Sequence, residues 1–243
     1  MKNKVVELDQ AVAAIKDGQT ILFGDWHGEN SAEEIITGVI EKNVKNITAV
    51  AVSGGMPDQG VGRMIVNHQV SNLLTTHIGL NPVAKDQYVA GELAVEFIPQ
   101  GTFTERIRAG GYGLGGVLTP TGVGTQVAEG KQVLNINGKD YLLEMPIRGD
   151  VALIKATKGD AAGNIYFRKT SGAISDMMAF AADTVICEVG ELVEVGELDP
   201  DEISVPAPVV DMIYVRKGEK KPFCPMWQRA KAKAEAKAAE GGK

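Results

Sequence analysis

One glutamine stands at a position where its side chain could take part in catalysis. Gln100 follows a predicted strand over residues 94–98, which Pro99 ends because proline has a fixed φ and no N–H. A side-chain amide can donate a hydrogen bond to a developing oxyanion without ionising. Since α/β sheets bind their ligands at strand ends, Gln100 is a candidate catalytic residue. The alternative is a glutamine in a turn, exposed to solvent.

A cluster of glycines shortly after Gln100 could bring backbone N–H groups close to a ligand. The alternative is a tight turn with no ligand. Between Gln100 and this cluster, Thr102 and Glu105 predict a capping box at the start of a short helix. The candidate ligand-binding glycines are Gly110, Gly111, Gly113, Gly115 and Gly116.

A second group of polar residues follows the predicted strand over residues 19–24. It contains Asp25, Trp26, His27 and Glu29. His27 has no second His or Cys beside it, which argues against a metal site, and His77 is predicted at a strand end. The side chains of this group could face a substrate. Alternatively, they point outward or cap a helix that Ser31 and Glu34 predict by a second capping box.

Strands and helices alternate along the chain, which predicts an α/β fold with a mostly parallel sheet flanked by helices. A β-rich segment over residues 117–148 interrupts the alternation, with a hairpin turn at Asn137-Gly138. We expect this segment to cover a site. The remaining predicted strands lie at residues 46–53, 73–77, 151–156, 164–168, 184–189 and 209–215. The predicted helices are one over residues 10–16 that Asp9 caps, one that starts at the Ser31 capping box and continues through Ile40, and one over residues 175–182.

The composition is that of an ordinary soluble enzyme subunit. A net charge of −6 over 243 residues argues against nucleic-acid and anionic-membrane partners, which require a basic face. Cys187 and Cys224 are too few for a disulfide framework. With no signal peptide or apolar span in the sequence, we expect a cytoplasmic protein. Residues 1–220 are predicted to form the domain, and residues 221–243 a charged, solvated tail.

Longer motifs resemble those of a known family. The chain reads PQGT-x-x-ER-x-RAGG from Pro99, TPTG-x-GT from Thr119, and IRGD-x-AL-x-KA from Ile147. It also contains YVAGEL and AGN-x-x-FRK. Together these motifs resemble the alpha subunit of family I coenzyme A transferases of the 3-oxoacid and acetate type. The resemblance implies a CoA-transferase/sugar-phosphate isomerase-like fold and the transfer of CoA between an acyl-CoA and a carboxylic acid.

The resemblance also implies how the active site is divided. In this family the nucleophilic glutamate belongs to the beta subunit, so the chain would form half of a shared site in a heterotetramer of two alpha and two beta subunits. Coenzyme A would be substrate and product, with no permanently bound cofactor and no metal. Gln100 would contact the reacting carbonyl, and the glycine cluster would face the pantetheine of CoA.

The loop after the first long strand departs from the family pattern, which is GGF-x-x-x-G-x-P. The chain reads GDWHGENSA from Gly24, which places Asp25, Trp26, His27 and Glu29 near the expected acyl group. Such groups could pair with a polar acyl chain that bears an amino or hydroxyl group.

Glu29 and its neighbours also resemble the nucleophile motif of the beta subunit, but their place in the chain argues against that role. Two other functions are alternatives to a transferase half-site. One is a noncatalytic binding or assembly subunit, and the other is a different enzyme on the sugar-phosphate isomerase-like fold.

Overall fold

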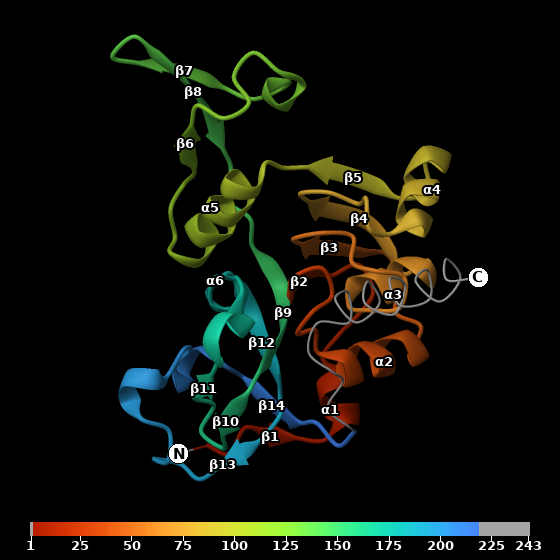
Figure 1. Cartoon of the computed structure of the whole chain (residues 1–243), viewed down its shortest axis with the longest axis vertical. Coiled ribbons are helices and arrows are strands. Elements are labelled where there is room, and N and C mark those ends of the chain that lie inside the picture. Colours follow the sequence, from red (N-terminus) through yellow and green to blue (C-terminus); the bar gives the residue numbers. More distant parts are fainter. Residues whose placement is uncertain (1, 219–243) are drawn as a thin grey trace, which may run out of the picture.

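The computed structural model describes residues 2–218, and its centre is an eight-stranded sheet in which every adjacent pair is parallel (Figure 1). The predicted parallel α/β fold is therefore confirmed. In spatial order the strands are β1 (Val5–Val6), β14 (Met212–Val215), β12 (Ala182–Val189), β9 (Gly149–Ala156), β2 (Thr20–Gly24), β3 (Ile47–Ala51), β4 (Val70–Thr75) and β5 (Ala94–Phe97).

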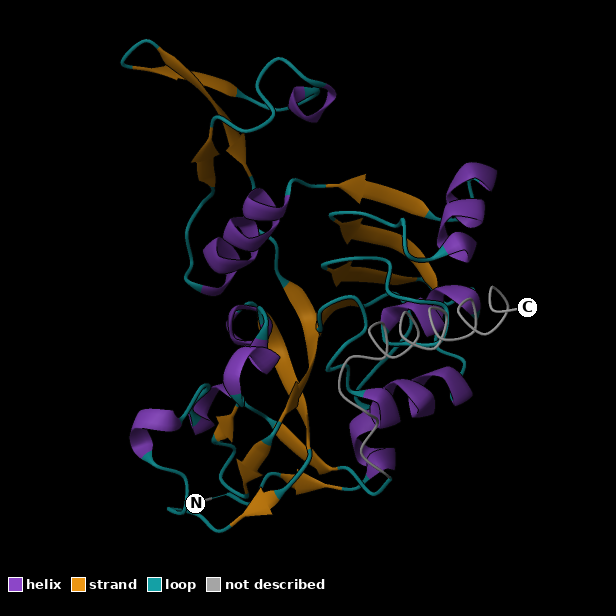
Figure 2. Cartoon of the chain, viewed as in Figure 1, coloured by secondary structure: helices purple, strands orange, loops and turns teal. Residues whose placement is uncertain are grey.

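Helices cover both faces of this sheet, as the purple ribbons of Figure 2 show. Ile21 and Phe23 of β2 belong to one apolar core, and Leu22 between them belongs to the other, because successive side chains of a strand point to opposite faces. The first core includes residues of α1 (Leu8–Ala13), α2 (Glu33–Glu41), α3 (Val61–Val66) and α4 (Pro82–Ala90). The second includes residues of α5 (Gln100–Gly111) and α6 (Ser175–Phe180).

The β-rich segment forms a three-stranded antiparallel sheet in the order β6-β8-β7. Its hairpin turn is confirmed, because Asn137 and Gly138 both have positive φ, 53° and 80°. In this chain the sheet projects beyond α5 (Figure 1), and its role as a cover for a site stays a prediction. Its strands are β6 (Val117–Thr119), β7 (Val133–Ile136) and β8 (Lys139–Glu144), with the 3-10 helix η1 (Gln126–Ala128) between β6 and β7.

An ion pair of 3.7 Å between Arg106 of α5 and Glu144 of β8 joins this projecting sheet to the body. The Arg106 guanidinium of α5 lies 2.6 Å from Glu96 of β5 and donates to the Met145 carbonyl at 2.7 Å. The Lys131 ammonium lies 2.7 Å from Glu144, which is buried. Arg106 thus contacts β5, β8 and the residue after β8, and the sequence motifs alone did not reveal these contacts.

The remaining elements lie around the carboxyl ends of β9 and β12. A second three-stranded sheet contains β10 (Lys158–Asp160), β11 (Ile165–Tyr166) and β13 (Leu192–Val193). Three 3-10 helices follow its strands: η2 (Lys169–Gly172), η3 (Pro200–Glu202) and η4 (Ala207–Val209).

Three predicted helix starts are wrong. Helix α5 begins at Gln100, and Thr102 lies buried inside the helix while Glu105 pairs with Arg108 at 2.6 Å. Helix α2 begins at Glu33, and Ser31 forms no cap. Helix α1 begins at Leu8, with Glu7 and Gln10 forming the capping box. In α5 the cause is packing, because Thr102 and Phe103 are buried within the helix.

Two expectations concern the ends and the cysteines of the chain. The predicted tail over residues 221–243, with Cys224, lies outside the described residues. Cys187 is buried in β12, and burial raises the pKa of its thiol, so it is an unreactive core residue. Within residues 2–218 there is no helix of sufficient length and hydrophobicity to cross a membrane.

Candidate functional site

The strand order reverses between β2 and β9. From β2 the chain continues to β3 on one side, and from β9 it leads to β12 on the other. The loops therefore diverge at this point, and open α/β sheets bind ligands in the crevice that results. A cleft of about 750 Å³ lies here, between the loop after β2 and the segment from Phe167 to Asp176. Its lining includes Trp26, Glu29, Asn30, Lys169 and Asp176.

The loop after β2 is a tight turn. The backbones of Trp26 and Glu29 pair in both directions, at 3.0 and 2.9 Å. Between them His27 and Gly28 have φ of 58° and 90°, the positive values that a type I′ turn requires. This geometry turns Trp26 and Glu29 toward the cleft.

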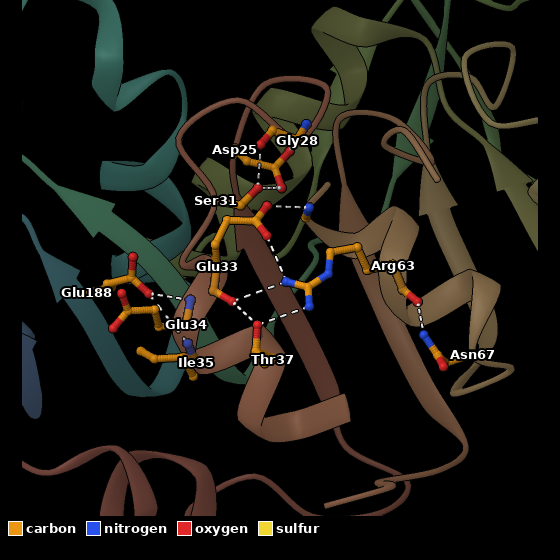
Figure 3. Close-up of polar contacts among 11 residues, drawn as sticks. Asp25, Gly28, Ser31, Glu33, Glu34, Ile35, Thr37, Arg63, Asn67 and Glu188 are labelled. Carbon is orange, nitrogen blue, oxygen red and sulfur yellow. Dashed lines mark hydrogen bonds and ion pairs between the residues drawn. The ribbon is translucent and has the colours of Figure 1, made fainter. Parts of the chain in front are cut away.

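Asp25 is buried and does not line the cleft, and Figure 3 shows its side chain beside Gly28 and Ser31. Its side chain is buried and accepts a hydrogen bond from the Gly28 N–H at 3.0 Å. The Ser31 hydroxyl lies 2.9 Å from the Asp25 carboxyl and 2.8 Å from the Gly28 carbonyl, although it has one proton to donate. A protonated Asp25 satisfies both contacts, because it donates to Ser31 while Ser31 donates to Gly28. The expectation that Asp25 faces substrate is therefore corrected for this chain.

The start of α2 is held by charges from two other elements (Figure 3). Glu33 accepts from the Gly60 N–H at 2.7 Å and pairs with Arg63 of α3 at 2.8 Å. Glu188 of β12 accepts from the Glu34 N–H at 2.9 Å and so replaces the predicted cap. Burial raises the pKa of the Glu188 carboxyl to about 7. Local patterns do not reveal this contact, because the two residues lie far apart in the chain.

The titration of Asp25 predicts a pH-dependent stability. Burial raises the pKa of its carboxyl from 3.8 to about 7, so the folded protein retains a proton that the unfolded chain releases. The contribution of Asp25 to stability is therefore full below about pH 4 and declines as the pH rises toward 7. The side chain of the Asp25→Asn variant is neutral at every pH. The free energy of unfolding of this variant, relative to that of the native protein, should therefore rise by roughly 2 kcal/mol between pH 5 and pH 8.

Thermal unfolding of the two proteins at several pH values measures this difference. Asp86→Asn is the control, because Asp86 is exposed on α4. A difference between Asp25→Asn and the native protein that stays constant from pH 5 to pH 8 would show that Asp25 is ionised when folded.

Two histidines meet beside the turn. The rings of His27 and His77 are 4.9 Å apart in an edge-to-face arrangement. Burial, and to a lesser degree His77, lowers the pKa of His27, so its ring stays neutral. His77 follows β4, where its backbone bridges to Ser53 after β3. The strand-end position predicted for His77 is confirmed, but its contact with His27 was missed, because their separation in sequence hides it.

Gln100 lies at the carboxyl end of β5, on the same edge of the sheet as the β2 loop. It is exposed in the first turn of α5, whose N-cap residue Pro99 makes no side-chain cap. The first N–H groups of α5 therefore point outward beside it. Because β5 is three strands from β2, the carboxyl ends of these two strands are about 14 Å apart at the usual spacing.

The glycines begin at the other end of α5, where Gly110 lies about 15 Å from Gln100 along the helix at about 1.5 Å per residue. Gly110 and Gly111 belong to the helix and not to a loop, and both allow close packing. A Cβ at Gly110 would collide with the Ile147 carbonyl oxygen, and one at Gly111 would lie 2.9 Å from Phe180 Cβ. Gly113, Gly115 and Gly116 follow in an exposed or half-buried loop. Close packing thus explains Gly110 and Gly111. That the loop with the other three glycines binds a ligand stays a prediction.

Comparison with known proteins identifies relatives over nearly the whole chain. Residues 5–216 match the family model described as coenzyme A transferase. The alpha subunit of the acetate CoA-transferase of Escherichia coli (strain K12) is 42% identical over 220 residues, which is 90% of this chain and 100% of the relative. The alpha subunit of the acetoacetyl-CoA:acetate/butyrate CoA transferase of Clostridium acetobutylicum is 40% identical over 213 residues, 88% of this chain and 98% of the relative.

A solved structure shares the fold. The acyl-CoA transferase of Escherichia coli O157:H7, in a thioester complex with CoA, superposes with a TM-score of 0.80 at 22% identity. The match covers 91% of this chain and 50% of that one, so this chain spans half the length of that transferase.

Proposed function

The chain belongs to the coenzyme A transferase family as an alpha subunit, and we propose that it forms half of an active site completed by a beta subunit. The beta subunit would supply the nucleophilic glutamate. The observation that carries this proposal is the 42% identity over the full length of a protein that is itself named as a subunit. We further propose a heterotetramer of two alpha and two beta subunits, with CoA as substrate and product.

In the proposed reaction the glutamate carboxylate attacks the acyl carbonyl of an acyl-CoA. The C–S bond breaks, CoA leaves as the thiolate, and a mixed anhydride forms. The thiolate then attacks the glutamyl carbonyl, which releases the first carboxylate and leaves CoA bound to the enzyme as a thioester. A second carboxylate then attacks the enzyme-bound thioester, and the same steps in reverse give the new acyl-CoA and free the glutamate.

Gln100 is the residue of this chain that we propose to stabilise the oxyanions of these steps. Its amide is exposed at the edge of the sheet beside the N–H groups that open α5. These donors lie at the positive end of the helix dipole, which favours a developing negative charge. Gly113, Gly115 and Gly116 remain candidates for contact with CoA.

The burial of Asp25 in the β2 loop supports a nucleophile from outside the chain. Asp25 is buried and bonded to Gly28 and Ser31, so it cannot reach a thioester. Glu29 closes the turn and lines the cleft. Family membership also removes the third possibility that the sequence left open, a different enzyme on the sugar-phosphate isomerase-like fold.

An assay of the complex tests the proposal. The chain carries an affinity tag in its source organism, and the complex that copurifies is incubated with acetyl-CoA and a panel of carboxylic acids. We expect a second subunit of similar size and the formation of new acyl-CoA esters, measured by chromatography. Hydrolysis of acetyl-CoA without a new ester would instead favour another reaction.

A further inference from the structure

We propose that the cleft between the β2 loop and α6 selects an acyl group that carries an ammonium ion. The inference rests on the proposed function, because it names the substrate class of the same site. Three neighbouring features carry it: the carboxylates of Glu29 and Asp176, and the indole of Trp26.

The charge of the cleft favours a cation. Glu29 and Asp176 are half-buried, whereas Lys169 is exposed in η2. Solvent screens an exposed charge more than a half-buried one. The two carboxylates therefore dominate the potential inside the cleft, and a buried ammonium ion requires such partners because its desolvation is costly.

The aromatic wall points to the same chemistry. Trp26 is 44% exposed and lines the cleft, so its ring is open to a ligand. An ammonium ion near the face of an indole gains a cation–π attraction that an uncharged chain does not. The turn of His27 and Gly28 and the buried Asp25 hold Trp26 in this place.

The cleft also has the size and the walls of a small-molecule site. Its volume of about 750 Å³ lies in the usual range for such pockets. The Asn30 amide donates to the Ser171 carbonyl at 3.2 Å and joins the two walls. Phe167 adds an apolar surface for the methylene groups of a short chain.

Competing CoA esters of equal length test the inference with the copurified complex. 3-Aminopropionyl-CoA and butyryl-CoA differ by an ammonium ion in place of a methyl group, and succinyl-CoA presents a carboxylate instead. We expect the native complex to prefer the aminopropionyl ester in kcat/KM. Asp176→Asn and Glu29→Gln should each lower the ratio of aminopropionyl to butyryl kcat/KM by about tenfold or more.

Lys169→Gln is the opposing variant in the same cleft and should raise this ratio, because it removes a repelling charge. Asp86→Asn, on the exposed side of α4, should leave the ratio unchanged. A ratio of kcat/KM does not depend on the fraction of folded enzyme, so partial misfolding cannot imitate the result.

The outcomes separate the two proposals. The ammonium inference would be overturned if the complex transferred CoA but preferred butyryl- or succinyl-CoA. It would also be overturned if the variants lowered kcat/KM for all esters equally. Either result would leave the proposed function standing. No transfer from any ester would overturn both.

Discussion

The chain purified without its partner is expected to show no transfer of CoA between acetyl-CoA and any carboxylic acid. The proposed account places the nucleophilic glutamate on the beta subunit, and a covalent mechanism without its nucleophile loses nearly all its rate. Removal of a nucleophile lowers kcat on the order of 10⁴-fold or more in well-studied enzymes. The donors of this chain alone, at Gln100 and the start of α5, cannot form the anhydride.

The measurement compares the isolated chain with the reconstituted complex at equal concentrations. Thermal unfolding of the isolated chain serves as its control, since a chain that does not fold would be inactive for another reason. A folded chain that transfers CoA at the rate of the complex would contradict the divided site. Glu29→Gln would then be the first variant to examine, because Glu29 lines the cleft.

Gln100→Ala in the complex should lower kcat by about 10²–10³-fold, the usual effect of removing one oxyanion donor. The KM for acyl-CoA should change little, because the interaction forms in the transition state and not in the ground state. Folding should survive. Gln100 is exposed in the first turn of α5, where alanine has the higher helix propensity.

A second exposed glutamine provides the matched control for this experiment. Gln126 lies in η1 of the projecting segment, away from the sheet edge, and Gln126→Ala should retain the native kcat. If Gln100→Ala folds, assembles and turns over at the native rate, then Gln100 has only a structural role. The alternative of a noncatalytic subunit would then be favoured.

The sequence predicted the sheet because its signals are local. Buried parallel strands appear as short apolar runs, as in β2, and the Asn137-Gly138 turn requires two positive φ values that few other residue pairs accept. Pro99 marked the end of β5 for an equally local reason. The family motifs are continuous stretches of sequence, so they too are local signals, and the family that they indicated is confirmed.

The details of the site depended on partners that are distant in sequence. The pattern around Ser31 predicted a helix cap, but the Ser31 hydroxyl is hydrogen-bonded to Asp25. Glu188 of β12 caps the helix instead. Gly110 looked like a loop residue, yet its missing Cβ makes room for the Ile147 carbonyl. Such choices are decided by tertiary packing, so local patterns could not predict them.

The location of the enzyme-bound thioester tests the divided active site most directly. The complex is incubated with acetyl-CoA in the absence of an acceptor acid, the two subunits are separated under denaturing conditions, and intact mass spectrometry finds which one has gained CoA. The account predicts a CoA adduct, removable by hydroxylamine, on a glutamate of the beta subunit but none on this chain. A CoA adduct on this chain, at Glu29 or any other residue, would contradict it.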